Sequence, residues 1–273
     1  MTHPKHILEQ AGIEPKKSLG QNFLFDDGLL ARIVAAAELS PEDEALEVGP
    51  GLGALTRVLA RAARRVVAVE LDGRLLPVLE SELSGLDNVE LVHGDVLELD
   101  PADWFAAPYV VVANVPYYIT GAILRHLLGS WPRPRRLVLT VQREVADRLT
   151  ARPPEMSLLA VSVQHYGRVR LVSGVRAGAF WPRPEVDSAV ARIDVDERHL
   201  AARAAETDAA EAAFFRVVRA GFSEKRKQLK NNLRQLGHDD AAIVVALARA
   251  GIDGRRRAET LTVAEWASLS ELL

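Results

Sequence analysis

The chain has 273 residues, of which 48% are hydrophobic and 26% charged with mixed signs, and its formal net charge is -3. This composition suits a globular protein with room for one large and one small domain, and the lack of cysteine excludes disulfides, thiolate nucleophiles and thiolate metal sites. Since there is no secretory-type apolar segment, no apolar run near the roughly 18 residues of a membrane span and no ligand-type histidine spacing, we expect a cytoplasmic protein with no membrane contact and no metal.

The first 40 residues contain a short basic segment and then a helix. Residues 15–24 (PKKSLGQNFL) include two lysines, and apolar side chains then recur at helical spacing at Leu29, Leu30, Ile33, Val34 and Ala37. A basic lead-in of this kind is usually plain surface, so it predicts no function by itself.

Residues 44–70 predict a strand, a glycine-rich turn, a helix and a second strand. The first strand is expected at residues 45–48, the turn is GPGLG at residues 49–53, and the strand at residues 66–69 ends on Glu70. The helix between them has one apolar face, made by Leu55, Val58, Leu59 and Ala62. The alternation continues with helices at 74–83 and 119–128 and strands at 89–92, 109–112 and 137–141. It predicts an α/β fold in which a parallel sheet has helices on both faces.

After Gln142 the pattern changes. Residues 158–163, 169–172 and 189–193 are predicted to be late strands, separated by loops rich in proline, glycine and arginine. Residues 194–207 predict a linker or a solvated helix, and helices are expected throughout the rest of the chain. There, the apolar faces comprise Phe214, Phe215, Val218, Leu229, Leu233, Leu236, Ile243, Val244 and Leu247. Thr262 to Glu265 has the pattern of a capping box that opens the last helix. We therefore expect domains at residues 1–200 and 201–273.

The glycine-rich turn and two strand ends predict a nucleoside cofactor. Only glycine lets a ligand approach the backbone closely at such a turn, so Gly49 and Gly51 are candidate contacts. Glu70 follows Gly49 by 21 residues, a spacing that suits acceptance of both hydroxyls of a ribose. A dinucleotide and S-adenosylmethionine both fit this pair. Asp95, which could accept an adenine amine, and a rim formed by Glu47, Glu70 and Asp95 favour the cationic S-adenosylmethionine over a phosphate-bearing dinucleotide.

The run Asn114-Val115-Pro116-Tyr117 follows a strand and has the residue types that hold a flat base with an amine. The exocyclic amine of adenine is a poor nucleophile because its lone pair is delocalised into the ring. If the Asn114 side-chain oxygen and the Val115 carbonyl accept its two hydrogens, the lone pair becomes localised and directed. Tyr117 would stack on the base, a contact worth roughly 1–3 kcal/mol, and Phe180 would close the pocket from the other side. The alternatives are an ordinary strand-end turn and a loop aromatic that fills the core.

A basic segment lies between Phe214 and Leu236. It has one acid, Glu224, against Arg216, Arg219, Lys225, Arg226, Lys227, Lys230 and Arg234. Such a local positive field can neutralise phosphates, whereas solvated helix faces normally mix signs. The surface could extend over Arg133, Arg135, Arg136, Arg168, Arg170 and Arg176. Structured RNA is favoured over duplex DNA because there is no helix-turn-helix or basic-zipper pattern.

Several motifs together resemble the rRNA adenine dimethyltransferase family, and most closely its bacterial members that act on small-subunit rRNA. The resemblance runs from about Lys16 to the C-terminus. Its motifs are residues 17–24 (KSLGQNFL), 47–53 (EVGPGLG), 114–117 (NVPY), 142–146 (QREVA), 180–188 (FWPRPEVDS), 221–227 (GFSEKRK) and 257–261 (RAETL).

The resemblance implies a Rossmann-like S-adenosylmethionine-dependent methyltransferase domain with a mostly parallel seven-stranded sheet, and a small all-α RNA-binding domain. It implies transfer of two methyl groups to each of two adjacent adenosines in the 3′-terminal hairpin loop of 16S rRNA, with a role in small-subunit assembly. We expect the partner to be 16S rRNA within an immature 30S subunit, and the protein to be a monomer.

The resemblance also implies residue roles. The expected cofactor contacts are Asn22, Leu24, Gly49, Gly51, Glu70, Asp95 and Asn114. The residues expected around the target base are Asn114, Tyr117 and Phe180. The expected RNA contacts are Val115, Pro116, Arg219, Lys225, Arg226, Lys227 and Lys230.

Two positions depart from the family pattern. Met156-Ser157 stands where relatives usually have Tyr-Gly, and Tyr118 where relatives often have Asn or His. Both concern the RNA-facing loops more than the reaction type. The alternatives are a 23S rRNA adenine methyltransferase of the macrolide-resistance type, a non-catalytic RNA-binding assembly or transcription factor, and a dinucleotide oxidoreductase. Residues 225–236 and 257–261 argue against the first, and the intact 114–117 run and glycine-rich turn against the second.

Overall fold

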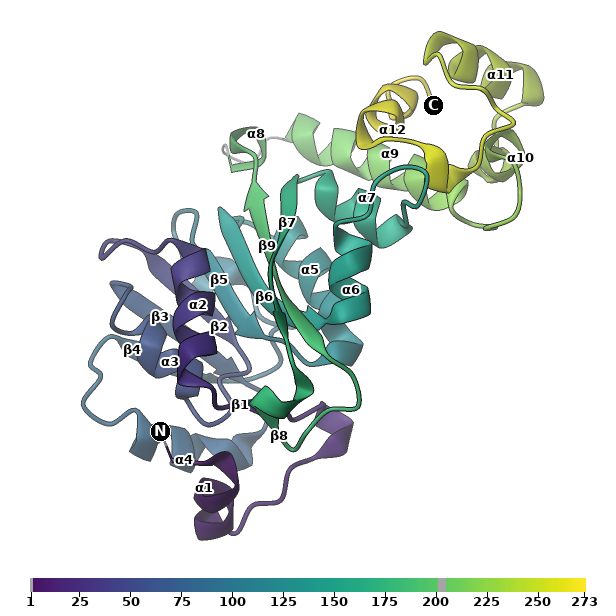
Figure 1. The fold of residues 1–273 in the computed structure, drawn as a ribbon. Coiled ribbons are helices and arrows are strands. Elements are labelled where there is room, and N and C mark those ends of the chain that lie inside the picture. Colours follow the sequence, from purple (N-terminus) through teal and green to yellow (C-terminus); the bar gives the residue numbers. More distant parts are fainter. Residues whose placement is uncertain (1, 201–204) are drawn as a thin grey trace. The chain divides into compact units, whose positions relative to one another are not determined.

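The structure is a computed structural model that describes residues 2–200 and 205–273 and divides the chain into two compact units. The first unit comprises Met1–Ala146 and Gly167–Leu200, and the second comprises Asp147–Tyr166 and Ala201–Leu273. Figure 1 shows the elements of each. Residues 147–166, which precede the last two strands in sequence, group with the C-terminal helices.

The first unit is built on a seven-stranded sheet in the order β4-β3-β2-β5-β6-β9-β7. Five strands are parallel to one another: β2 (Glu44–Val48), β3 (Arg65–Glu70), β4 (Val89–His93), β5 (Val110–Asn114) and β6 (Arg136–Gln142). β9 (Ser188–Val195) pairs antiparallel with both β6 and β7 (Gly167–Val175). The predicted α/β fold with a mostly parallel seven-stranded sheet is therefore confirmed.

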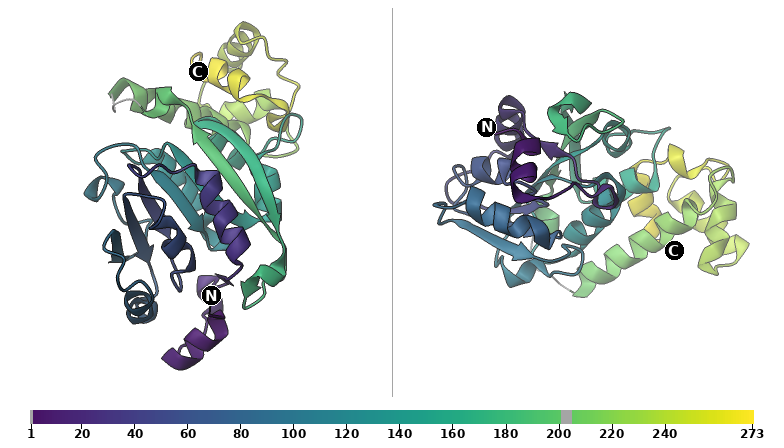
Figure 2. Two further views of the ribbon diagram at one scale, coloured as in Figure 1. Left: turned by 60° about the vertical axis from the view of Figure 1, so that its left-hand side comes forward. Right: turned by 90° about the horizontal axis from the view of Figure 1, so that it is seen from below.

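Helices cover both faces of this sheet. The α-helices that begin in the first unit are α1 (Pro4–Ala11), α2 (Asp27–Ala37), α3 (Ala54–Leu59), α4 (Leu76–Glu82), α5 (Thr120–Gly129), α6 (Arg143–Leu149) and α8 (Glu197–Leu200). α2 and α3 lie over one face and α5 over the other (Figures 1 and 2). Right-handed crossovers that run in opposite directions along the sheet place α3 and α5 on opposite faces. The predicted apolar residues of α2 are all buried. α3 ends at Leu59, so Ala62 lies beyond it.

Short elements complete the first unit. β1 (Phe23–Leu24) and β8 (Phe180–Trp181) form a two-stranded antiparallel sheet in which Leu24 is opposite Phe180. The 3₁₀ helices of this unit are η1 (Lys17–Leu19), η2 (Gly73–Leu75), η3 (Pro101–Asp103), η4 (Tyr117–Ile119) and η5 (Ala177–Ala179).

The second unit is helical. Its elements are α7 (Leu158–Gln164), α9 (Ala205–Gly221), α10 (Leu229–Leu233), η6 (Arg234–Leu236), α11 (Asp240–Arg249), η7 (Ala258–Thr260) and α12 (Val263–Ser270). Trp266 is fully buried among the apolar faces of these helices. The predicted capping box is confirmed, because Thr262 Oγ1 accepts from Glu265 N at 3.1 Å and Glu265 Oε2 accepts from Thr262 N at 2.7 Å. None of the described helices is long and apolar enough to cross a membrane.

Three local predictions are wrong. Residues 158–163 form a helix, α7, and not a strand. Ser157 Oγ caps this helix by accepting from Ala160 N at 3.1 Å. The chain from 208 on is not helical throughout, since residues 222–228 form a turn that contains much of the basic segment. Val244, expected on an apolar face, is 57% exposed.

Candidate active site

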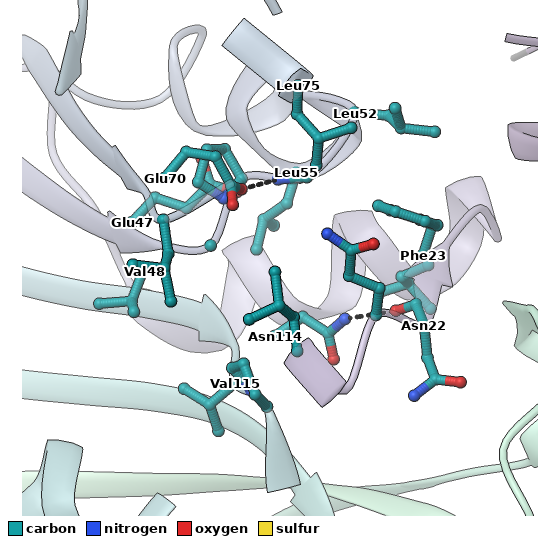
Figure 3. A pocket seen from close by; sticks show the side chains of 18 of the residues that line it. Asn22, Phe23, Glu47, Val48, Leu52, Leu55, Glu70, Leu75, Asn114 and Val115 are labelled. Atoms are coloured by element: carbon teal, nitrogen blue, oxygen red, sulfur yellow. Dashed lines mark hydrogen bonds between the residues drawn. The ribbon is translucent and has the colours of Figure 1, made fainter. Parts of the chain in front are cut away.

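A pocket opens where β2, β3 and β5 end. Its walls come mainly from residues 19–24, 47–52 and 114–119, and Figure 3 shows part of them. The empty volume is about 1200 Å³, including the open solvent at the mouth. Ligands of parallel α/β sheets bind outside the carboxyl ends of the strands, as here. All the residues expected to contact the cofactor line this pocket: Asn22, Leu24, Gly49, Gly51, Glu70, Asp95 and Asn114.

The glycine-rich turn brings the backbone to the edge of the pocket. Gly49 and Gly51 have φ values of 70° and 60°, which favour glycine. A Cβ on Gly51 would lie 3.0 Å from the Phe23 ring, whereas a Cβ on Gly49 would meet nothing within 4 Å. The turn therefore needs glycine for its conformation, and at Gly49 the backbone is open to a ligand.

Glu70 joins the end of β3 to this turn. Its Oε2 accepts from Gly51 N at 3.1 Å and its Oε1 from Asp72 N at 2.8 Å, and Figure 3 shows the first of these bonds. Burial raises the pKa of this carboxyl, although the backbone donors oppose the rise. A carboxylate offers about four lone-pair positions, so Glu70 retains acceptor capacity for the hydroxyls of a ribose.

Glu47, at the end of β2, is 1% exposed. Burial raises its pKa to about 8, and the nearby Glu70 carboxyl acts in the same direction. Glu47 is therefore mainly protonated at pH 7. The rim of Glu47, Glu70 and Asp95 therefore has less negative charge at neutral pH than three ionised carboxylates would give.

Asp95 follows β4 and lines the pocket from another strand end. Its Oδ1 accepts from Leu97 N at 2.9 Å. For Oδ2, the part of the chain that the structure describes provides no hydrogen-bond donor. This oxygen is thus available to accept an amine hydrogen.

Asn114 is the last residue of β5, and its amide is held in one orientation. Its Nδ2 donates to the Asn22 carbonyl at 3.0 Å, as Figure 3 shows. The Nδ2 of Asn22 in turn donates to the Gly20 carbonyl at 3.0 Å. No described residue donates to Asn114 Oδ1. The donor side of the amide is therefore engaged, while its oxygen is free to accept at the pocket.

Tyr117 lies in η4 with its ring half-buried at the pocket wall. Its hydroxyl is 2.6 Å from Ser188 Oγ. Ser188 is 1% exposed and is paired with Gln142 of β6 and Val175 of β7. Burial raises the pKa of Tyr117, so its hydroxyl stays neutral at physiological pH. The ring is thereby tied to the sheet at the edge of the pocket.

Phe180 is the expected site residue that the structure does not bring to the pocket wall. It is 3% exposed and packs in the core with Leu24, Leu30 and Val175. The alternative interpretation, a loop aromatic that fills the core, describes its position. In the pairing between β8 and β1, Phe180 is opposite Leu24, and both belong to one buried cluster, whereas of the two only Leu24 lines the pocket.

Sequence reasoning missed the contribution of α1. Pro4 and Ile7 of α1 line the pocket, as does Thr2, which precedes the helix. Ile7 and Leu8 are buried in a cluster with Phe23. The sequence feature that could have indicated α1 was Pro4, because proline is favoured in the first turn of a helix; His3 is the N-cap.

The expected RNA contacts of the C-terminal part belong to the second unit. Arg219 lies on α9, residues 225–227 lie in the 222–228 turn and Lys230 lies on α10. All five side chains are exposed. Lys227 pairs with Glu224 at 2.6 Å, and no described acid pairs with Arg219, Lys225, Arg226 or Lys230.

Three arginines that were expected to extend this surface instead stabilise the first unit. Arg133 is 5% exposed and donates to the Leu128 and His199 carbonyls. Arg135 pairs with Asp43 at 2.7 Å, and Arg136 pairs with Asp194 at 2.6 Å. The remaining members of that set are exposed on or beside β7: Arg168, Arg170 and Arg176.

Comparison with known proteins gives consistent matches. Residues 13–273 match the family described as "Ribosomal RNA adenine dimethylase". Curated relatives called "Ribosomal RNA small subunit methyltransferase A" include one from Dehalococcoides mccartyi (strain CBDB1), 44% identical over 98% of this chain and 92% of the relative. Another, from Moorella thermoacetica (strain ATCC 39073 / JCM 9320), is 45% identical over 98% of this chain and 95% of the relative.

Solved structures match as well. The 23S rRNA methyltransferase ErmE has a TM-score of 0.73 and 32% identity, covering 92% of this chain and 99% of that one. A dimethyladenosine transferase from Plasmodium falciparum has a TM-score of 0.77 and 23% identity, covering 90% and 95%. The likeness to the Plasmodium falciparum protein shows a shared fold.

Proposed function

The chain belongs to the ribosomal RNA adenine dimethylase family, and from this premise we propose its substrate and the roles of its residues. It methylates the exocyclic amines of two adjacent adenosines in the 3′-terminal hairpin loop of 16S rRNA, adding two methyl groups to each. We propose that the substrate is an immature 30S subunit, that the protein contributes to small-subunit assembly, and that it acts as a monomer in the cytoplasm.

The family and fold imply S-adenosylmethionine as the cofactor, which supplies an activated methyl group. The residues of the pocket fit such a group. Glu70 retains acceptor positions for ribose hydroxyls, Asp95 Oδ2 suits the adenine amine, and the backbone at Gly49 is open. We propose that Asn22, Leu24, Gly51 and Asn114 complete the cofactor contacts.

The state of the Asn114 amide is the observation that best supports this function. Because Nδ2 donates to Asn22 O at 3.0 Å, the free acceptor of the amide is Oδ1. We propose that Oδ1 and the Val115 carbonyl accept the two amine hydrogens of adenine and localise the nitrogen lone pair. The nitrogen becomes acidic only after it has gained the methyl group, so it then releases a proton to solvent and needs no strong base.

Other residues position the base and the RNA. Tyr117 stacks on the target adenine, and Pro116 stiffens the turn that directly follows the two residues that hold the amine. Phe180 acts through Leu24, against which it is paired. Arg219, Lys225, Arg226, Lys227 and Lys230 contact phosphates of the rRNA.

A 23S rRNA substrate is the second candidate, since ErmE is 32% identical over 92% of this chain. The experiment that separates the two is transfer of tritiated methyl groups to purified immature 30S subunits and to 50S subunits. The labelled adenosines are then located by nuclease mapping. Label on two adjacent adenosines near the 3′ end of 16S rRNA supports the proposal, and label confined to 23S rRNA contradicts it.

Asn114→Ala removes the amide oxygen, so we expect the rate of methyl transfer to fall on the order of 100-fold, as for loss of a preorganised polar contact. The matched control is Gln10→Ala, which removes an exposed amide on α1. Full activity in Asn114→Ala would remove Asn114 from the mechanism.

A further inference from the structure

Tyr118 is an exposed aromatic side chain at the mouth of the pocket. It is 59% exposed, and the other exposed large apolar side chains in the described ranges are aliphatic. It lines the same pocket as Asn114 and Tyr117. The packing of the protein does not account for an aromatic ring in solvent at this place, whereas the neighbouring Tyr117 is tied to Ser188.

The backbone at Gly20 holds the Tyr118 ring beside the pocket. A Cβ on Gly20 would lie 3.5 Å from Tyr118 Cε1 and 3.4 Å from Pro116 Cβ. Gly20 has a φ of 62° and ends η1. The ring thus packs against a residue without a side chain, while most of its surface remains in solvent. Within residues 2–200 and 205–273, no group forms a hydrogen bond with its hydroxyl.

A cation lies in the same turn. Lys17 is exposed at the start of η1, and its carbonyl accepts from Gly20 N at 3.0 Å. Lys16 lies 3.8 Å from Asp72, but Lys17 has no acidic partner among the described side chains. Lys17 begins the turn that ends at Gly20, the residue against which the Tyr118 ring packs. An exposed ring can stack on an unstacked base, and a cation can bind a phosphate.

We propose that Tyr118 stacks on the nucleobase adjacent to the adenosine that occupies the pocket, with Lys17 near the phosphate that joins the two. This inference rests on the proposed function, in which two adjacent adenosines react. Tyr117 and Tyr118 are consecutive, so a base inserted against the first leaves its neighbour beside the second. The exposed ring keeps the second adenosine unstacked and close to the pocket while the first is methylated.

The test measures methyl transfer to immature 30S subunits by the wild-type protein and three variants. Tyr118→Ala removes the ring, and we expect KM for the subunit to rise about 5- to 100-fold, the range of a lost base–aromatic stack. We also expect label to become unequal between the two adenosines. The Kd for S-adenosylmethionine, measured by calorimetry, should stay within about twofold because stacking concerns the RNA alone.

Two matched variants separate stacking from packing. Tyr118→Phe keeps the ring and should retain the wild-type KM, whereas Tyr118→Leu keeps apolar volume against Gly20 and should behave like Tyr118→Ala. The inference is overturned if Tyr118→Leu matches the wild type, or if Tyr118→Ala leaves both KM and the distribution of label unchanged. If the wild-type protein labels neither adenosine of 16S rRNA, the proposed function itself fails.

Discussion

At the residue scale, Glu47 couples the pocket to pH. Burial raises its pKa to about 8 from an ordinary value of 4.5. In the unfolded chain the same carboxyl loses its proton near 4.5. Between these values the folded state binds a proton that the unfolded state has lost. The free energy of unfolding therefore falls as pH rises through this window, by up to roughly 1.4 kcal/mol per pH unit.

Glu47→Gln should remove this dependence, because an amide cannot ionise. We expect the Tm of the variant minus that of the wild type to be constant below pH 4.5 and to increase up to about pH 8. The Tm difference should increase by about 2–4 °C for each kcal/mol by which the wild type's free energy of unfolding falls. Thermal unfolding of both proteins across this range measures the effect, with the exposed Glu144→Gln as control. A Tm difference that stays flat from pH 4 to 9 would contradict the buried, protonated state.

At the element scale, the parts of the site that the sequence predicts are those with local causes. The glycine-rich turn is set by positive φ at Gly49 and Gly51, and Glu70 and Asn114 are placed by the ends of buried strands. These patterns are complete within a few residues. They therefore predict the parallel sheet and the positions of Glu70 and Asn114, whereas Asn22, which binds the Asn114 amide, was expected only from the family resemblance.

The elements that the sequence did not predict depend on distant contacts. Residues 158–163 are a short apolar run whose periodicity does not distinguish a strand from a helix. Ala160 and Val161 are buried against Phe214 and Val217 of α9, about 50 residues later. Phe180 is similarly placed by its pairing with Leu24. Local propensity contains no information about either partner.

Asn232 fixes the turn at residues 222–228, which joins α9 to α10 in the second unit. It is 2% exposed, and its Nδ2 donates to the Gly221 carbonyl at 2.6 Å and to the Glu224 carbonyl at 3.0 Å. A residue with a side chain cannot replace Gly221 without a shift of its neighbours, because a Cβ there would lie 2.3 Å from the Trp266 ring. The end of α9 and the start of the turn therefore depend on this one amide.

Asn232→Ala should destabilise the second unit and loosen the 222–228 turn. We expect a loss of about 1–3 kcal/mol, the usual effect of leaving buried partners unsatisfied, together with weaker rRNA binding. The matched control is Asn231→Ala on the same helix, where the side chain is only partly buried. Denaturant unfolding and RNA binding test both effects, and equal behaviour of the two variants would show that the turn does not need this amide.

At the scale of the whole molecule, charge is distributed unevenly. The chain has a net charge of -3, yet residues 214–236 hold seven basic residues and one acid. Some of these cations are already paired, such as Lys227 with Glu224 and Arg234 with Asp240. Lys225, Arg226 and Lys230 are exposed and form no salt bridge with a described acid, although Arg234 and, more weakly, Lys230 lower the pKa of Asp240. Arg219 on α9 is likewise exposed and forms no salt bridge with a described acid, and these cations have most to gain from a phosphate.

Neutralising them should reduce the salt dependence of rRNA binding. Each cation that releases a counterion contributes about one to the slope of log affinity against log salt. The triple variant Lys225→Ala, Arg226→Ala and Lys230→Ala should therefore have a slope shallower by about 2–3. The control neutralises three exposed arginines of the first unit, Arg32, Arg61 and Arg125, which changes net charge equally. Equal slopes in both triple variants would mean that total charge determines the salt dependence. A shallower slope in the first variant alone would show that the phosphates bind at the turn of residues 222–228 and at α10.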